Sequence, residues 1–149
     1  MGETRMALEW TDSLDTVDWE ELSALYTIAL GPKPAADLAV VFGNSRYRCF
    51  VRDDGRIVGV GRALADGIDT SYLCDIAVLP DYQGTGLGKQ IVSRLVALSH
   101  GHKKILLYAV PGKEPFYRKF GFGRMKTAMA LFDDQALARE RGYLDDEEA

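Results

Sequence analysis

Three glycines at alternate positions stand in residues 78–89 (VLPDYQGTGLGK). An apolar run precedes this stretch and an apolar-periodic run follows it, which predicts a strand, a glycine-rich turn and a helix. Glycine permits dihedral angles that a Cβ forbids and lets the backbone approach a ligand closely. Unpaired amides at a helix start, together with the helix dipole, form a site for an anion such as a pyrophosphate. The stretch therefore predicts a phosphate-binding turn.

The glycine spacing separates this turn from two common phosphate-binding motifs. It is not the GxxxxGK[ST] of a P-loop, and its glycines fall as G-x-G-x-G, not GxGxxG. Residues 83–88 (QGTGLG) instead match the Q/R-x-x-G-x-G/A pattern of the GNAT (GCN5-related N-acetyltransferase) superfamily. Residues 114–122 (EPFYRKFGF) resemble a second segment of that family, FYxxxGF. The two motifs, with a predicted strand between them, carry the resemblance.

The resemblance implies an α/β (α+β) fold with a mixed central sheet: an antiparallel N-terminal meander, two splayed parallel central strands, and flanking helices. It also implies acetyl-CoA as acyl donor, with no metal. The pantetheine arm of acetyl-CoA would pair with the main chain of Ile76, Ala77 and Val78. One of these main-chain amides would polarise the thioester carbonyl. The pyrophosphate would lie on the amides of residues that we expect from the motif: Gln83, Gly84, Thr85, Gly86, Leu87, Gly88 and Lys89.

Two candidate catalytic residues follow. Tyr117 matches a tyrosine that protonates the departing CoA thiolate in many members, and a phenol with pKa near ~10 can do so. Otherwise Tyr117 only packs against CoA, and Phe116 is expected to be either a core residue or part of the CoA-binding wall. Asp75 is the one acid within the predicted central strand, on the face of Leu73 and Ala77 if side chains alternate. It is either a general base or a paired structural carboxylate, and many members use a water chain instead.

Periodicity and turn residues predict the elements that position these groups. Asp15 or Asp18 is expected to cap the first helix. The strand at 104–110 should pair in parallel with the strand before the glycine turn, because a helix connects them. Helices are predicted at residues 18–30, 34–42, 91–98, 114–120 and 135–141, and strands at 7–10, 47–52, 56–65, 70–78, 104–110 and 124–132.

The resemblance also places the first two helices and their connection over an acceptor pocket. Residues expected near that pocket by position alone are Tyr26, Leu30, Pro32, Pro34 and Phe42, each of which could equally be a core or turn residue.

Composition is that of one globular domain of 149 residues, with an acidic tail at 133–149. The net charge of −4 and the lack of an extended basic stretch argue against nucleic acid or an anionic membrane as partner. No signal peptide or long apolar run is visible, and two cysteines in apolar runs suggest reduced thiols, so a cytoplasmic protein is expected.

The leading hypothesis is an N-acetyltransferase that acts on the primary amine of a small molecule by direct attack in a ternary complex. The alternatives are a non-catalytic acyl-CoA binding or sensing domain, which needs neither Tyr117 nor Asp75, and a protein or peptide N-acetyltransferase, which needs an open groove. Dimers are common in the superfamily, and the question of a homodimer stays open.

Overall fold

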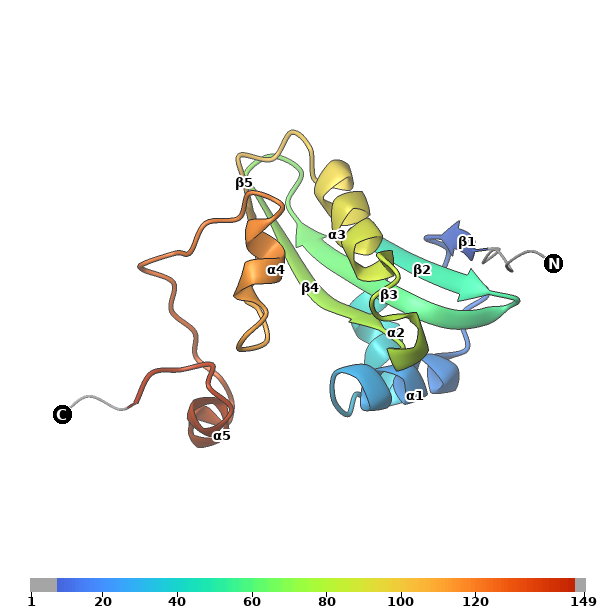
Figure 1. Cartoon of the computed structure of the whole chain (residues 1–149), viewed down its shortest axis with the longest axis horizontal. Coiled ribbons are helices and arrows are strands. Elements are labelled where there is room, and N and C mark those ends of the chain that lie inside the picture. The colour runs from blue at the N-terminus through green and yellow to red at the C-terminus, as the bar shows by residue number, and fades with distance from the viewer. Residues whose placement is uncertain (1–7, 147–149) are drawn as a thin grey trace. The chain divides into compact units, whose positions relative to one another are not determined.

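The computed structural model describes residues 8–146 and divides into two compact units, one ending at Leu107 and the other beginning at Tyr108. The first unit contains one five-stranded sheet (Figure 1). Its strand order is β1-β2-β3-β4-β5, antiparallel from β1 to β4 and parallel between β4 and β5, as predicted. The strands are β1 (Leu8–Thr11), β2 (Tyr47–Asp53), β3 (Arg56–Ala65), β4 (Thr70–Val78) and β5 (Lys104–Leu106).

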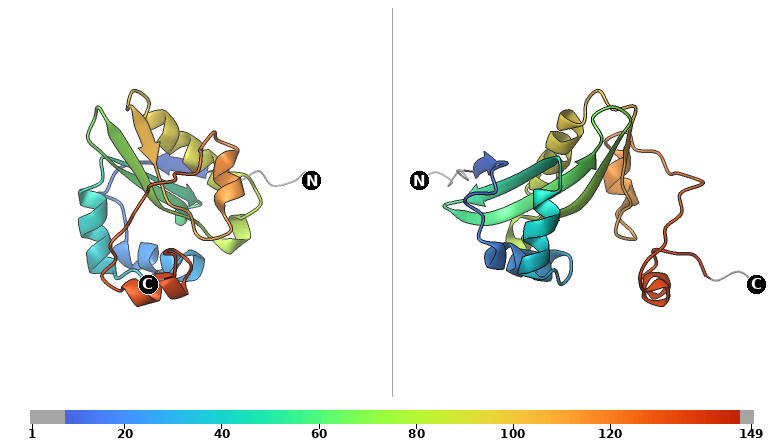
Figure 2. Two further views of the ribbon diagram at one scale, coloured as in Figure 1. Left: turned by 90° about the vertical axis from the view of Figure 1, so that its left-hand side faces the viewer. Right: turned by 180° about the vertical axis from the view of Figure 1, so that it is seen from behind.

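Helices cover both faces of this sheet. Helices α1 (Trp19–Ala29) and α2 (Ala35–Gly43) lie on one face, and α3 (Leu87–Leu98) crosses the other (Figures 1 and 2). The apolar positions of α3 that fall at helical spacing, Ile91, Val92 and Leu95, are fully buried against the sheet. Asp18 caps α1, because its carboxylate accepts the amides of Glu20 and Glu21.

Two glycines of β3 let α3 lie close to the sheet. A Cβ at Gly59 would lie 2.8 Å from Ile91 Cδ1, and one at Gly61 would lie 2.9 Å from both Ile91 Cγ2 and Leu95 Cδ1. Such distances are far inside van der Waals contact, so a larger residue would push the helix outward. The same contacts show that Gly59 and Gly61 face α3, and that Val60 and Arg62 face α1 and α2.

The second unit contains two short helices, α4 (Glu114–Arg118) and α5 (Gln135–Glu140). An aromatic cluster organises it: the ring of Tyr108 meets those of Tyr143 and Phe132 edge-on, at centroid distances of 5.5 and 6.2 Å. Helix α5 follows its prediction, while α4 ends two residues earlier than predicted.

Two strand predictions need correction, and one lies partly outside the described residues. Residues 124–132 form no strand, since a strand needs a hydrogen-bonding neighbour and none is seen for this segment among residues 8–146. Its alternating apolar residues are exposed instead, Met129 to 96% and Leu131 to 90%. The strand predicted at 104–110 ends at Leu106. The prediction for 7–10 includes Ala7, which lies outside the described residues.

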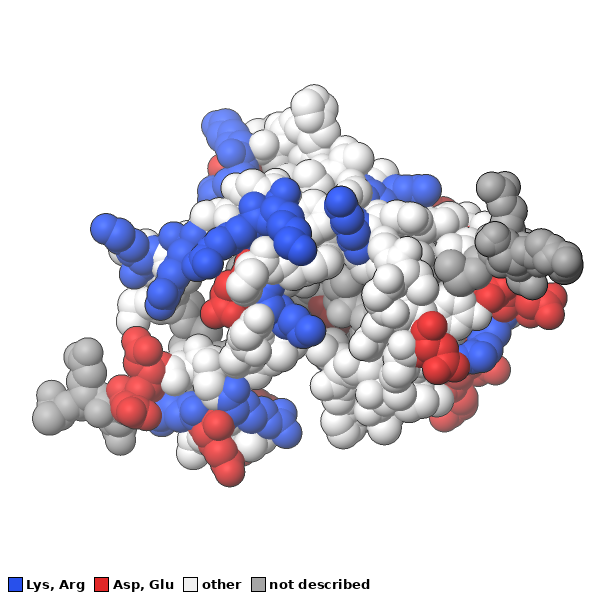
Figure 3. Space-filling view, viewed as in Figure 1, with Lys and Arg blue, Asp and Glu red and all other residues white. Residues whose placement is uncertain are grey.

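The surface carries charges of both signs with uncharged regions between them (Figure 3). Among the residues that the structure describes, no helix has the length and apolar character that a bilayer span requires.

Candidate functional site

The glycine turn lies between β4 and α3 and includes a short 3₁₀ helix, η1 (Pro80–Tyr82). Gly84 and Gly86 have φ angles of 80° and 90°, and Gly86 is the N-cap of α3. A Cβ at either glycine would meet nothing within 4 Å, so the positive φ rather than crowding requires glycine there. Gln83 ties the turn to the strand, because its Nε2 donates to the Val78 carbonyl oxygen at 3.0 Å.

Helix α3 begins without a charged cap. Its N-cap residue, Gly86, has no side chain to accept the first amides, and the Leu87 amide donates a long hydrogen bond of 3.4 Å to Thr85 Oγ1. The side chain of Leu87 is buried beneath the turn. An uncapped helix N-terminus with two positive-φ glycines fits a pyrophosphate.

The C-terminal half of β4 has β3 on one edge only. Its pairing with β5 stops at Tyr72↔Leu106, so, within the part of the chain that the structure describes, β5 leaves the next edge of β4 uncovered. Ile76, Ala77 and Val78 form this part of β4, and an extended ligand could add to the sheet along its uncovered edge. The parallel pairing is thus confined to the first residues of β4, because β5 ends at Leu106, and the splaying of the two strands stays a prediction.

A β-bulge interrupts β4 at Asp75. The register between β3 and β4 shifts between Val60 and Arg62, so Gly61 stands opposite two residues, Asp75 and Ile76. Asp75 has a φ of 56°, in the left-handed region that aspartate enters more readily than most residues. The phenol of Tyr26 on α1 donates to the Asp75 carbonyl oxygen at 2.7 Å and so holds the bulged backbone from the α1 face of the sheet.

The bulge changes which side chains share a face of β4. Asp75 lies with Ala77 on the face of α1 and α2, opposite Ile76, as alternation predicts. The same prediction is wrong for the residues before the bulge, because Cys74 shares the face of Asp75 and Leu73 lies on the face of α3. The extra residue of the bulge shifts the alternation of side chains between the two faces, so the prediction fails for the residues before it.

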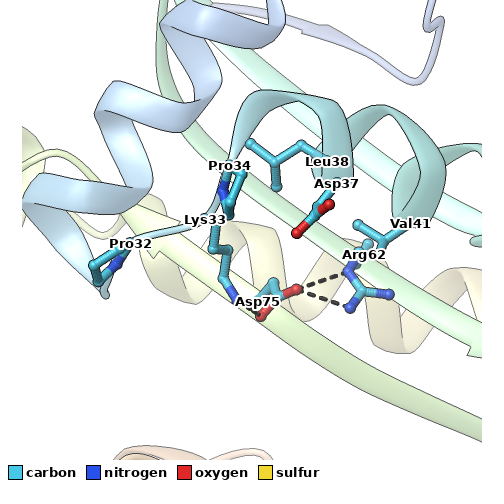
Figure 4. A pocket seen from close by; sticks show the side chains of 8 residues that line it. All are labelled: Pro32, Lys33, Pro34, Asp37, Leu38, Val41, Arg62 and Asp75. Atoms are coloured by element: carbon cyan, nitrogen blue, oxygen red, sulfur yellow. Dashed lines mark hydrogen bonds and ion pairs between the residues drawn. The ribbon is translucent and has the colours of Figure 1, made fainter.

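The Asp75 carboxylate has two cationic partners (Figure 4). Arg62 on β3 places Nε and Nη2 each 2.8 Å from Oδ2, and Lys33, between α1 and α2, places Nζ 3.1 Å from Oδ1. Arg62 also donates from Nη1 to Ser45 Oγ at 3.2 Å. With side-chain exposures of 16% for Asp75 and 13% for Arg62, this pair is shielded from water.

Arg62 and Lys33 were missed as site residues, although the sequence contained a signal for Arg62. It is the only charged residue in the interior of β3 and lies on the strand adjacent to Asp75, so each charge was a candidate partner for the other. Lys33 carried no such signal, because it lies in a loop where charged residues are ordinary.

A cavity of about 260 Å³ opens beside this cluster. Apolar walls from the start of α2 and the preceding loop meet the charged groups there (Figure 4). The carboxylate of Asp37 faces the cavity without an ion-pair partner among the described residues. The lining residues are Pro32, Lys33, Pro34, Asp37, Leu38, Val41, Arg62 and Asp75. Of the residues expected here by position, Pro32 and Pro34 line the cavity, whereas Tyr26 and Phe42 are fully buried.

Burial changes the acidity of two groups near the bulge. It raises the pKa of the Tyr26 phenol well above its ordinary value, with the nearby Asp75 charge acting in the same direction. Burial also raises the pKa of the Cys74 thiol to about 11, against the opposing effect of Arg62. Both side chains are therefore neutral at physiological pH.

Phe116 and Tyr117 lie on α4 in the second unit. Their rings meet edge-on at 5.0 Å between centroids, and Tyr117 makes a similar contact with Phe122 at 6.1 Å. Burial raises the pKa of the Tyr117 phenol, which keeps it protonated at neutral pH. A protonated phenol is the form that a general acid requires.

Comparison with known families and structures supports the interpretation of the motifs. Residues 45–124, more than half of the chain, match the model of the acetyltransferase (GNAT) domain. The fold matches a probable acetyltransferase from meticillin-resistant Staphylococcus aureus with a TM-score of 0.74 and 25% sequence identity, over 85% of this chain and 98% of the other.

Two curated plant proteins are also similar. Serotonin N-acetyltransferase 2, chloroplastic, from Oryza sativa subsp. japonica is 43% identical over 70 residues, which cover 46% of this chain and 35% of the rice protein. GCN5-related N-acetyltransferase 3, chloroplastic, from Arabidopsis thaliana is 34% identical over 116 residues, covering 74% of this chain and 48% of that protein. The chain thus spans half or less of the length of either relative.

Proposed function

Because the chain belongs to the GNAT family of acetyltransferases, we propose that it transfers an acetyl group from acetyl-CoA to the primary amine of a small molecule. The observation that carries the proposal is the position of the cavity. It lies beside the bulge of β4, on the strand whose uncovered edge leads into the glycine turn. A donor bound along that edge and an acceptor in the cavity would meet at one strand.

The donor would be held mainly by backbone atoms. The edge of Ile76, Ala77 and Val78 offers main-chain donors and acceptors to an extended amide-containing arm. The amides from Gln83 to Lys89 suit the pyrophosphate, since the positive φ angles of Gly84 and Gly86 turn that segment around an anion. Bound acetyl-CoA supplies the activated acyl group, and an amide of this chain would polarise its carbonyl.

The size and lining of the cavity favour a small acceptor. A volume of about 260 Å³ is below the range of typical drug-sized sites, and its walls include Pro32, Pro34 and Leu38. The carboxylate of Asp37 suits an ammonium group. The name of the rice relative also refers to a small amine, serotonin. These features support a small primary amine with an apolar part as the acceptor class.

The two titratable candidates would divide the proton transfers. Tyr117 would return a proton to the departing thiolate, since burial keeps its phenol protonated. Asp75 would act on the acceptor amine. Arg62 occupies its Oδ2, so Oδ1, which now contacts Lys33 Nζ, is the oxygen that an amine in the cavity would meet. Transfer would then be direct, from sulfur to nitrogen, in a ternary complex.

Thiol release from acetyl-CoA across a panel of amines tests the proposal. The panel runs from arylalkylamines and polyamines to amino sugars, amino acids and short peptides, with calorimetric titration of CoA in parallel. Turnover with a small amine supports the proposal. Turnover with peptides alone would reassign the acceptor, and tight CoA binding without turnover on any amine would favour a sensing domain.

A further inference from the structure

We propose that Lys33 is itself an acetyl acceptor, modified within its own chain when acetyl-CoA is bound. The inference rests on the proposed function, because it requires a donor along the edge of β4. It adds a modification site to that function. What carries it is a primary amine of the chain that already lies in the cavity assigned to the acceptor.

The backbone at Lys33 is held in place. Its carbonyl oxygen accepts a hydrogen bond from Ser23 Oγ on α1 at 2.6 Å. Pro32 and Pro34 flank it, and a proline restricts both its own φ and the conformation of the residue before it. The loop therefore holds the Lys33 backbone in an orientation that directs its side chain toward β4.

The side chain enters the cavity and ends at the bulge. Lys33 Nζ lies 3.1 Å from Asp75 Oδ1 and 5.6 Å from the centre of the Tyr26 ring, and 30% of the side chain stays exposed (Figure 4). The residue after Asp75 begins the main-chain edge assigned to the donor. The proposal requires that this flexible amine moves from Asp75 toward a thioester bound beside the next residue, Ile76.

The chemistry of the step is that of the proposed reaction. The Lys33 ammonium gives one proton to Asp75 Oδ1, the acceptor already in contact with it, and from there to water. Nζ then forms a bond to the acetyl carbonyl carbon and the carbon–sulfur bond breaks. The thiolate takes the phenol proton of Tyr117, as in the proposed reaction, and the second nitrogen proton restores that phenol. The products are acetyl-Lys33, free CoA and one released proton.

Acetylation would change the charge of the pocket. The modified side chain loses its positive charge, so the Lys33–Asp75 ion pair and the cation–π contact with Tyr26 are lost. Arg62 would then be the only cation on Asp75 among the described residues. The cavity would become more negative, which favours a cationic acceptor.

Lys104 provides a matched internal control. Its Nζ also pairs with an aspartate, Asp69 Oδ1 at 3.0 Å, but the pair lies on the surface with side-chain exposures of 48% and 52%. Chemical acetylation without catalysis would favour Lys104, because it is the more accessible amine. Catalysis in the cavity would favour Lys33.

The experiment incubates the purified chain with acetyl-CoA and no added amine, and follows each lysine by peptide mass spectrometry over time. We expect acetyl-Lys33 to form at least ~10-fold faster than acetyl-Lys104, with a first-order rate that does not change with protein concentration. Lys33→Arg should abolish this modification, whereas Lys104→Arg should leave it unchanged.

Each contrary result has a distinct meaning. Amine turnover by a protein whose Lys33 stays unmodified overturns the self-acetylation and leaves the proposed function standing. Equal labelling of Lys33 and Lys104, or a rate that rises with protein concentration, also overturns it. If calorimetry detects no CoA binding, the self-acetylation and the proposed function fail together.

Discussion

Arg62 binds a single oxygen of Asp75 with two of its nitrogens, Nε and Nη2, each at 2.8 Å, across the boundary between β3 and β4. The pairing joins the strand that carries the bulge to the strand beside it. It also leaves Oδ1 as the oxygen that faces the cavity, where Lys33 now lies.

Replacing Asp75 with Asn should destabilise the fold. The amide would leave the Arg62 and Lys33 charges without a counter-ion in a shielded site, so we expect the free energy of unfolding to fall by about 1–3 kcal/mol. Urea denaturation measures it. Asp69→Asn is the control, because its partner Lys104 is exposed and such pairs contribute about 0–1 kcal/mol. Equal losses would show that the Asp75 cluster has no special stabilising role.

Replacing Tyr117 with Phe should lower turnover by ~10²-fold or more, since the hydroxyl is the proton donor of the proposed mechanism. The affinity for CoA should stay the same, because the ring remains. Steady-state thiol release and calorimetry give the two quantities. Tyr143→Phe, also in the second unit, should leave turnover unchanged, and a fully active Tyr117→Phe enzyme would remove the acid role.

Alanine at Gly86 and at Gly43 should have opposite effects. Gly86 has a φ of 90°, where an L-residue costs about 1–2 kcal/mol, so Gly86→Ala should weaken both folding and CoA binding. Gly43 ends α2 without a positive φ or a nearby atom, so Gly43→Ala should be neutral or stabilising, by up to about 1 kcal/mol. Thermal denaturation and CoA titration measure the two effects. If the two variants behaved alike, the turn would not require glycine at position 86.

The two thiols should be poorly reactive at neutral pH. Burial raises the pKa of Cys49 to about 12 and that of the half-buried Cys74 to about 11. An aromatic disulfide reagent should therefore not react with Cys49, and should react only slowly with Cys74, until the protein unfolds. Because both pKa values rise on folding, their stabilising contribution is complete below pH 9 and is lost as the pH approaches 11 to 12. Rapid labelling of the native protein would contradict this burial.

The sequence predicted the glycine turn, the antiparallel meander and the parallel return because each has a local signal: positive-φ glycines, turn residues and a helical crossover. It did not predict the β-bulge, since the only sign is a register shift between two strands. It therefore placed Leu73 and Cys74 on the wrong faces. Lys33 was missed because it lies in the loop between α1 and α2, where a charged residue is ordinary. The predicted strand at 124–132 failed for another reason: alternation specifies a strand only where a neighbour exists to pair with it.

The bulge of β4 has a consequence for how the chain can be shortened. With Asp75 removed, Leu73, Cys74, Ile76, Ala77 and Val78 would alternate without interruption, each on the face that it already occupies. Asp75 is thus an insertion into an otherwise regular strand. A one-residue deletion at this position should be compatible with the sheet and harmful to the pocket, whereas a deletion elsewhere in β4 would turn part of the core toward the wrong side.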